Sequence, residues 1–353
     1  MSSFASKAMS ESSFLAGPRP IVPPGPVPIA VDKHYDFLDW SPDGESLFLG
    51  TSELTSRSWA GSIWVFNSKE TQCANNNKPW RPQADECVVG ASMDCGVTVG
   101  RFMRCPDRLV VGCDSGAVQV IGLRQYGEAT KLEGEGSLSE HNDTVLDIDD
   151  LGGEGVEYVT CSQDKSIKVW DLDVLISTRT FSPAHAHIVT SVRAQPSQSK
   201  CFASCARDGS ALLWDIRDDN PASKIMDPCG VGLTSLAWVD ETNIVVGGVS
   251  GQLIVIDIRN ISDIKFKLQL DHRPVHSLKS IPDNSGLVGV CQDNSKVSVA
   301  QFEGESPQIL YSNDSHGDFV RGLSWHPQNF SLWSCGWDSY IMPHIPRSVN
   351  GST

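Results

Sequence analysis

Residues 158–171 read YVTCSQDKSIKVWD, and residues 201–215 read CFASCARDGSALLWD. Each stretch runs from one apolar segment through a polar turn to a second apolar segment that ends in Trp-Asp, the pattern of a β-hairpin. A histidine precedes both stretches, and His141 and His185 lie 44 residues apart (185 − 141), as do the two tryptophans of the Trp-Asp ends. The chain therefore contains an internal repeat with a fixed period.

A period of about 40–45 residues ending in Trp-Asp is typical of WD-repeat β-propellers, in which each repeat builds one four-stranded blade. Five further units of short strands separated by Gly, Asn, Asp and Ser accompany this pair. We therefore predict an all-β fold, a seven-bladed WD-repeat β-propeller over residues 27–346. A Ser- and Pro-rich tail at 1–26, disordered or polyproline-like, precedes it, and a short tail at 347–353 follows.

The seventh unit stops after about its third strand, near Pro346. An uncovered outer strand would leave an open sheet edge. We expect residues around Val27–His34 to supply the missing outer strand, so that an N-terminal strand closes the ring.

The composition places further bounds on function. Twenty-eight basic and 43 acidic residues give a net charge of −15, which repels nucleic acid and attracts basic partners. The 11 cysteines lack paired CxxC spacing, so we expect a reducing compartment and neither a zinc site nor a disulfide framework. We expect no signal peptide or membrane span, since no run of 18 apolar residues occurs.

A Ser or Thr, a His and an Asp recur together in the repeats. Such a set suggests a catalytic triad, but its repetition from blade to blade favours a buried structural hydrogen-bond network. His344 stands where the seventh blade would carry its tryptophan. The predicted network residues are His141, Thr160, Asp164, Trp170, His185, Ser204, Asp208, Trp214, His316, Ser334 and Asp338.

Motifs of common enzymes are missing from the sequence: there is no P-loop, no GxGxxG before a helix, no HExxH and no GxSxG. We predict no catalytic residue, no metal and no cofactor. A hydrolase site of acidic residues at the centre of the propeller is an alternative for which the sequence nominates no pair.

Two segments go beyond the generic repeat. One is Ser52–Phe66, which contains the string Trp-Ala-Gly-Ser-Ile-Trp, and the other is His316–Trp325, followed by Gly336-Trp-Asp338. With these segments the chain resembles the methylosome protein 50 family from about residue 35 to 346. That family provides the WD-repeat partner of the type II protein arginine methyltransferase, which makes symmetric dimethylarginine.

The resemblance implies a non-catalytic subunit that docks on the N-terminal TIM-barrel domain of the methyltransferase. It also implies a role in presenting Arg-rich substrates such as Sm proteins and histone tails, in the cytoplasm and the nucleus. In the family a tryptophan on a first-blade loop inserts into the enzyme, and the matching residue is Trp59.

The residues around Trp59 agree with that role. Trp59 stands in a polar loop with Arg57 and Ser58, just before a strand, a composition typical of an interface hot spot. The alternative is that Trp59 folds back on its own blade. Tyr311 is a candidate second exposed aromatic contact, whereas Phe319 and Val320 are expected in the core.

Acidic residues that attract basic substrates are not identified by the sequence, and Glu133, Glu135, Asp147, Asp149 and Asp150 are candidates only. The polar insertions at 69–85 and 122–140 are species-specific surfaces or, by default, slack loops. The preferred function is an adaptor in a methyltransferase complex, without direct nucleic acid or membrane contact. Another WD-repeat scaffold, such as a ubiquitin-ligase substrate receptor or a histone reader, is the alternative.

Overall fold

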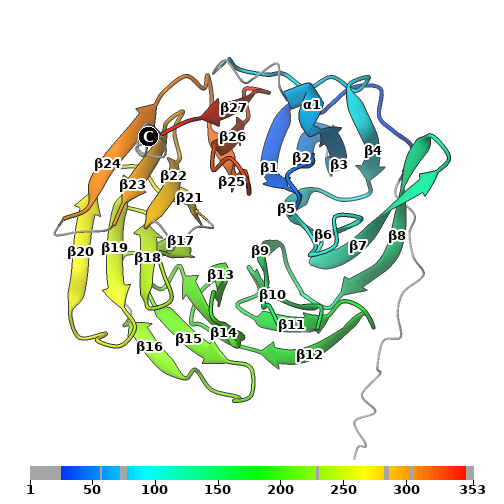
Figure 1. The fold of residues 1–353 in the computed structure, drawn as a ribbon. Helices are drawn as coiled ribbons and strands as arrows, with labels where there is room; N and C mark the ends of the chain where they lie inside the picture. Colours follow the sequence, from blue (N-terminus) through cyan, green and yellow to red (C-terminus); the bar gives the residue numbers. More distant parts are fainter. Residues whose placement is uncertain are drawn as a thin grey trace, which may run out of the picture.

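The chain forms a ring of seven antiparallel sheets (Figure 1). The structure, a computed structural model, describes residues 25–55, 58–71, 78–153, 155–227, 230–281, 286–302 and 306–346, with the backbone alone at 54–55, 58–59 and 70–71. Within these ranges the one helix is a single turn, α1 (Ser68–Thr71), and no helix is long and apolar enough to cross a membrane.

Each sheet is a blade whose strands follow one another in chain order from the centre outward, as the repeat predicts. Blades 1 to 6 have four strands in the described residues, and blade 7 has three. In chain order the strands are β1 (His34–Trp40), β2 (Ser46–Thr55), β3 (Ser58–Asn67), β4 (Cys87–Met93), β5 (Val97–Phe102), β6 (Arg108–Cys113), β7 (Ala117–Tyr126), β8 (Ala129–Ser139), β9 (Val145–Asp150), β10 (Glu157–Ser162), β11 (Ile167–Asp171), β12 (Ile176–Phe181), β13 (Val189–Gln195), β14 (Gln198–Ala206), β15 (Ala211–Asp215), β16 (Ser223–Met226), β17 (Leu233–Trp238), β18 (Asn243–Gly248), β19 (Gln252–Asp257), β20 (Ile264–Gln269), β21 (Val275–Ser280), β22 (Leu287–Gln292), β23 (Val297–Gln301), β24 (Gln308–Asn313), β25 (Val320–Trp325), β26 (Leu332–Gly336) and β27 (Ile341–His344).

The apolar core lies between neighbouring blades. Seven clusters of buried side chains each join two adjacent sheets, and the cluster between blades 7 and 1 includes Trp333 and Trp40, whose rings meet edge to face with centroids 5.3 Å apart. A blade therefore buries both of its faces only when the ring is complete. This dependence explains why the strands carry apolar residues on both faces.

The predicted closure of the ring by Val27–His34 is wrong. Blade 1 already has four strands of its own, and His34 begins its innermost strand β1. Outside the sheets, the backbone of Gly25 and Pro26 pairs instead with Ser92 on the outer strand of blade 1.

Trp80, within the 69–85 insertion, covers part of the outer edge of blade 7. Its N–H and C=O form two backbone hydrogen bonds of 2.8 Å with Ile341 in β27. Its indole is 8% exposed and packs in the core cluster shared by blades 7 and 1. Pro343, the next residue of β27 that faces the same way, has no N–H, so this short edge presents few free donors.

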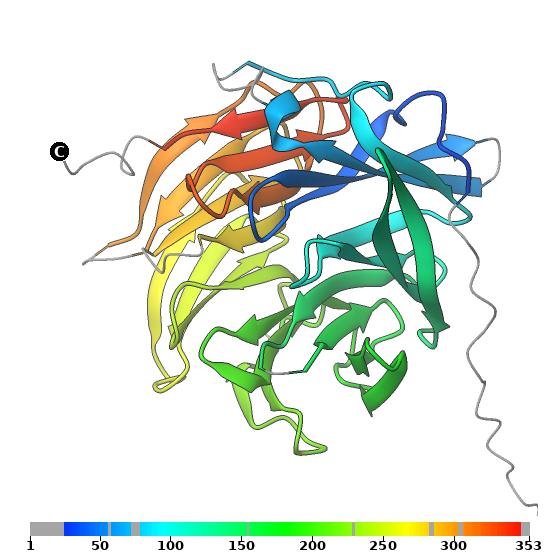
Figure 2. The ribbon, with the colours of Figure 1, turned by 45° about the vertical axis from the view of Figure 1, so that its right-hand side comes forward.

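The second insertion, 122–140, is an ordered hairpin and not the slack loop expected by default. Strands β7 and β8 pair over ten residue pairs, from Ala117↔Ser139 to Tyr126↔Ala129. Leu123 and Leu132 pack against the core between blades 1 and 2. The hairpin thus rises along the outside of blade 1 beside β4 (Figures 1 and 2).

Candidate partner-binding arm and central channel

In blade 3 the repeated polar residues form a hydrogen-bonded set. Thr160 Oγ1 lies 2.8 Å from His141 Nε2 and accepts a 2.8 Å hydrogen bond from Trp170 Nε1. His141 Nδ1 lies 3.2 Å from Asp164 Oδ2, and the same carboxylate oxygen accepts from the Asn142 amide at 2.8 Å. Burial opposes ionisation of Asp164, but the hydrogen bonds from His141 and Ser166 outweigh it and hold its pKa well below the ordinary value.

Blade 4 repeats this arrangement. Ser204 Oγ lies 2.7 Å from His185 Nε2 and accepts from Trp214 Nε1 at 2.8 Å, while Asp208 accepts from the Ala186 amide at 2.9 Å. His185 Nδ1 is 3.9 Å from Asp208. Burial lowers the pKa of His185 to about 4, so its imidazole is neutral at pH 7.

In blade 7 a histidine replaces the tryptophan. Ser334 Oγ lies 2.7 Å from His316 Nε2 and 2.7 Å from His344 Nε2, and His316 Nδ1 lies 2.9 Å from Asp338 Oδ2. The hydroxyl oxygens at the centre of the three sets belong to fully buried side chains, Thr160, Ser204 and Ser334. A nucleophile in a triad must reach its substrate, so these sets tie turns to loops and do not form active sites.

Trp59 lies on a projecting arm and not in the loop that we expected. The sheet partners of β2 and β3 end at Ser52, paired with His34, and at Gly61, paired with Met93. Beyond them β2 and β3 continue alone for three more pairs, from Glu53↔Ala60 to Thr55↔Ser58. We call residues 53–55 and 58–60 the β2–β3 arm, whose three residue pairs extend about 10 Å past the neighbouring strands at 3.3 Å per residue.

The arm explains how a blade can present a residue to a partner. Beyond Ser52 and Gly61 the two strands pair only with each other, and Figure 2 shows this hairpin reaching the edge of the molecule. Trp59 is the second residue of β3, with its backbone opposite Leu54. Arg57 lies outside the described residues, as do the side chains of Ser58 and Trp59.

Tyr311 is not the exposed aromatic contact that we predicted. It lies half-buried in β24, its hydroxyl is 3.1 Å from His344 Nδ1, and its ring packs edge-on to that imidazole at 5.6 Å. Tyr311 thereby fixes the histidine that replaces the seventh-blade tryptophan. It supports the blade from within.

Phe319 was expected in the core but is 37% exposed, whereas Val320 is buried. Its ring meets Trp337 edge-on at 5.8 Å, and the Arg321 guanidinium lies 4.6 Å from the centroid of Trp337 and 5.0 Å from that of Phe319. Arg321 also bonds Asp293 at 2.6 Å. This stacked group lies at the edge of the central channel. Arg321 itself occupies the position over the two rings in which a cation would be favoured.

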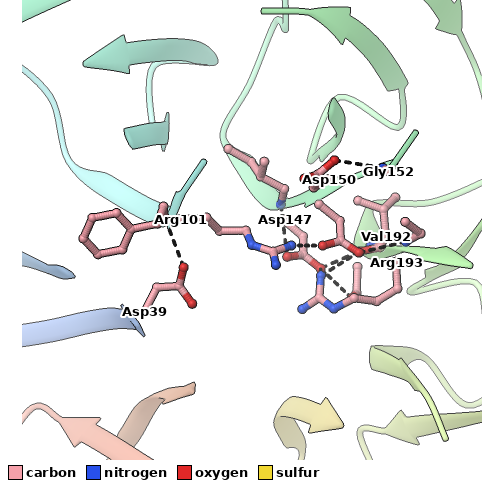
Figure 3. A network of polar contacts seen from close by, with 12 residues as sticks. Asp39, Arg101, Asp147, Asp150, Gly152, Val192 and Arg193 are labelled. Carbon is pink, nitrogen blue, oxygen red and sulfur yellow. Dashed lines mark hydrogen bonds and ion pairs between the residues drawn. The ribbon is translucent and has the colours of Figure 1, made fainter. Parts of the chain in front are cut away.

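A channel runs through the centre of the ring and holds a cavity of about 500 Å³, lined by the inner strands of all seven blades. Polar side chains on its wall join blades 1 to 4 to one another (Figure 3). Asp39 accepts from the Phe102 amide at 3.0 Å, and Asp149 accepts from the Ala194 amide at 2.8 Å. Because an inner strand is a sheet edge, these acids satisfy amides that would otherwise lack a partner.

The acidic residues proposed as substrate contacts are largely engaged within the protein. Asp147 pairs with Arg193 and Asp149 with Arg101, while Asp150 pairs with Arg104 at 2.6 Å and Glu135 with Arg108 at 2.8 Å. Glu133 accepts from the Tyr126 hydroxyl at 2.6 Å. Asp147 and Asp149 do not form a free carboxylate pair of the kind that a hydrolase needs, and among the described residues no three His, Cys, Asp or Glu side chains gather as a metal site.

Comparisons with known proteins agree with this architecture. Residues 134–171 and 176–215 match the family model "WD domain, G-beta repeat". Over 326 residues the chain is 28% identical to "Methylosome protein WDR77" of Xenopus laevis, an alignment that covers 91% of this chain and 92% of the relative. It is 26% identical to "Protein tipD" of Dictyostelium discoideum, over 65% of this chain and a third (33%) of that protein.

Among solved structures, a chain of "Crystal Structure of Mitotic Checkpoint Complex" matches with a TM-score of 0.69 at 14% identity, over 98% of this chain and 97% of that one. At this identity the match concerns the fold alone. The methylosome relative, by contrast, aligns along nearly the whole of both chains.

Proposed function

We propose that this chain, which the comparisons assign to the methylosome protein 50 family, is the non-catalytic adaptor of a type II protein arginine methyltransferase. The observation that carries the proposal is the near full-length similarity to a methylosome WD-repeat protein. The β2–β3 arm, with Trp59 at the position that the resemblance assigns to enzyme docking, supplies a structural basis.

The arm suits such a role for physical reasons. A two-stranded hairpin holds its backbone by cross-strand hydrogen bonds, so little conformational entropy is lost when its tip is buried in a partner. The blade behind it is fixed by core packing and is independent of what the tip carries. An indole presented in this way acts as an anchor in a pocket of the enzyme.

Substrate presentation follows from the net charge of −15. An acidic adaptor attracts Arg-rich tails, such as those of Sm proteins and histones, and raises their concentration near the bound enzyme. Turnover then improves without a catalytic group from this chain. We place this function in the cytoplasm and the nucleus, where those substrates occur.

The experiment is a Trp59→Ala substitution with binding to the purified methyltransferase measured by calorimetry or surface plasmon resonance. We expect a loss of at least about 2 kcal/mol, or roughly thirtyfold in Kd. Tyr126→Ala is the matched control, because Tyr126 is a 54% exposed aromatic at the tip of the other projecting hairpin. Unchanged binding by a folded Trp59→Ala variant would refute the anchor, and no binding by the wild-type chain would refute the function.

A further inference from the structure

The seven inner strands share one register, which makes their residues directly comparable. Near the start of each strand an apolar or aromatic residue is followed by a β-bulge, as at Val97, Val189 and Val275. The same bulge recurs in the other four blades, in blade 1 after Tyr35. The residue four positions further along therefore lies at one level of the channel in every blade. From blade 1 to blade 7 these residues are Asp39, Arg101, Asp149, Arg193, Ala237, Lys279 and Ser324.

Charges alternate around the first four blades of this level, which we call the channel ring. Arg101 pairs with Asp149, and Arg193 pairs with Asp147, two residues before Asp149 on the same strand. Figure 3 shows the two guanidinium groups directed at carboxylates of β9. Here each cation has an acidic neighbour, so its charge is compensated.

The alternation fails at blade 5. Ala237 stands where the next acid would be, and the corresponding residue of blade 7 is Ser324. Lys279, between them, has no hydrogen-bond or ion-pair partner for its ammonium within the described part of the chain. Its backbone carbonyl accepts a 2.8 Å hydrogen bond from Trp325 Nε1, which fixes the position of the strand beneath it.

Lys279 faces the cavity and not the outer solvent. Together with Arg101 and Arg193 it lines the space of about 500 Å³ at the centre of the ring, which is within the usual range for small-molecule sites. The charged groups around it are Arg193, Arg101, Asp147 and Asp39. Asp147 is bound by Arg193 and three further donors, Ser191 and the amides of Ile148 and Val192. Asp39 is bound by the Phe102 amide and Ser324.

We propose that the central channel binds a small oxyanion, a phosphate or carboxylate group, between Lys279 and Arg193 at the uncompensated side of the channel ring. Lys279 supplies three donors without a protein acceptor, and Arg193 supplies those that Asp147 and the Val192 carbonyl leave free. The site is separate from the β2–β3 arm, and this inference does not rest on the adaptor function.

Proton linkage follows from the surroundings of Lys279. Burial, and then the charges of Arg193 and Arg101, lower the pKa of Lys279 to about 7, so its amine is only partly protonated near neutral pH. A bound anion favours the charged form and raises this pKa. Binding near pH 7 should therefore be accompanied by proton uptake, and the uptake should be smaller at pH 6, where more of the amine is already charged.

The test is calorimetric titration of the full chain at constant ionic strength with inorganic phosphate and, separately, with acetate, which stays ionised between pH 6 and 7 and therefore reports the proton uptake of the protein itself. Runs in two buffers of different ionisation enthalpy measure the proton uptake. We expect saturable binding in the millimolar range or tighter, with uptake that falls from pH 7 to pH 6. The stronger of the two probes identifies the preferred group.

Lys279→Met should weaken binding at least tenfold, and Lys224→Met, which removes an exposed lysine from β16, should leave it unchanged. If neither probe binds saturably, or if Lys279→Met binds as the wild type does, the proposal is wrong. Acetate binding without proton uptake at pH 7 would equally overturn the assignment to Lys279, and that measurement uses the unmodified chain.

Discussion

Removal of the Trp80 indole tests how blade 7 is completed. Trp80 comes from the polar insertion after blade 1, yet its ring packs at 5.2 Å edge-on to Phe66 and in one cluster with Trp333 and Ile341. Trp80→Ala deletes a side chain that is 92% buried (8% exposed) and leaves a cavity between blades 7 and 1. The two backbone bonds to Ile341 can persist in the variant.

The expected cost is about 3–5 kcal/mol of unfolding free energy, the range for buried Trp→Ala substitutions. The hydrogen bond from Trp80 Nε1 to Glu86 adds little, since at 3.3 Å it is long and the carboxylate is accessible. Trp80→Phe should lose roughly half as much, because the phenyl ring still fills part of the space.

The assay is urea unfolding followed by far-ultraviolet circular dichroism, with the slope of the transition compared between variants. Tyr126→Ala, at an exposed site, should change the unfolding free energy by less than about 0.5 kcal/mol. A loss below about 1 kcal/mol for Trp80→Ala would refute the reasoning. It would mean that the insertion lies on blade 7 without completing its core.

Two further predictions concern the repeated polar sets. Asp208→Asn should lower the unfolding free energy by about 1–3 kcal/mol, because the Ala186 amide and Ser210 lose a charged acceptor; urea unfolding measures this, and a loss of methyltransferase stimulation at full stability would contradict it. The unfolding free energy should also fall as the pH drops from about 6.5 towards 4. Burial lowers the pKa of His185 to about 4 and that of His344 to about 3, so the folded protein keeps both imidazoles neutral. The unfolded chain binds protons below its ordinary histidine pKa, so the stability present above that pKa is lost on acidification. His344→Asn should show a smaller slope over this range than the wild type, and an equal slope would remove His344 from the account.

The fold could be predicted from the sequence because the sequence repeats with the period of a propeller blade. A period of 44 residues and the recurring Trp-Asp ends specify the blade, and the chain length specifies the number of blades. The resemblance to the methylosome family could also be recognised in the sequence, because the segments around Trp59 and His316 that carry it are short continuous stretches. The similarity along 91% of the chain confirms the resemblance.

Contacts between segments that are far apart in the chain could not be predicted from the sequence. We predicted that residues Val27–His34 complete blade 7, because an uncovered outer strand would leave an open sheet edge. Blade 7 has three strands in the described residues, and it is Trp80, from the polar insertion after blade 1, that pairs with its outer strand. Phe319 was predicted in the core but is 37% exposed, and Tyr311 was predicted exposed but is half-buried, because the burial of an aromatic side chain is not determined by its neighbours in sequence. Its orientation depends on partners such as Arg321 and His344 that lie in other strands.

The channel ring shows how acidic side chains that stabilise the fold can be distinguished from those that are free to bind a ligand. An acid on an inner strand can be retained because it satisfies an amide of the next blade, as Asp39 and Asp149 do, and such a residue is not available to a substrate. Lys279 meets no such need, since a lysine ammonium cannot accept from an amide, and no carboxylate of the described residues forms an ion pair with it. A half-buried ammonium without a partner destabilises the ring unless a bound group compensates its charge. An anion in the channel would remove that cost, which is why the residue without a structural role is the one that points to a ligand.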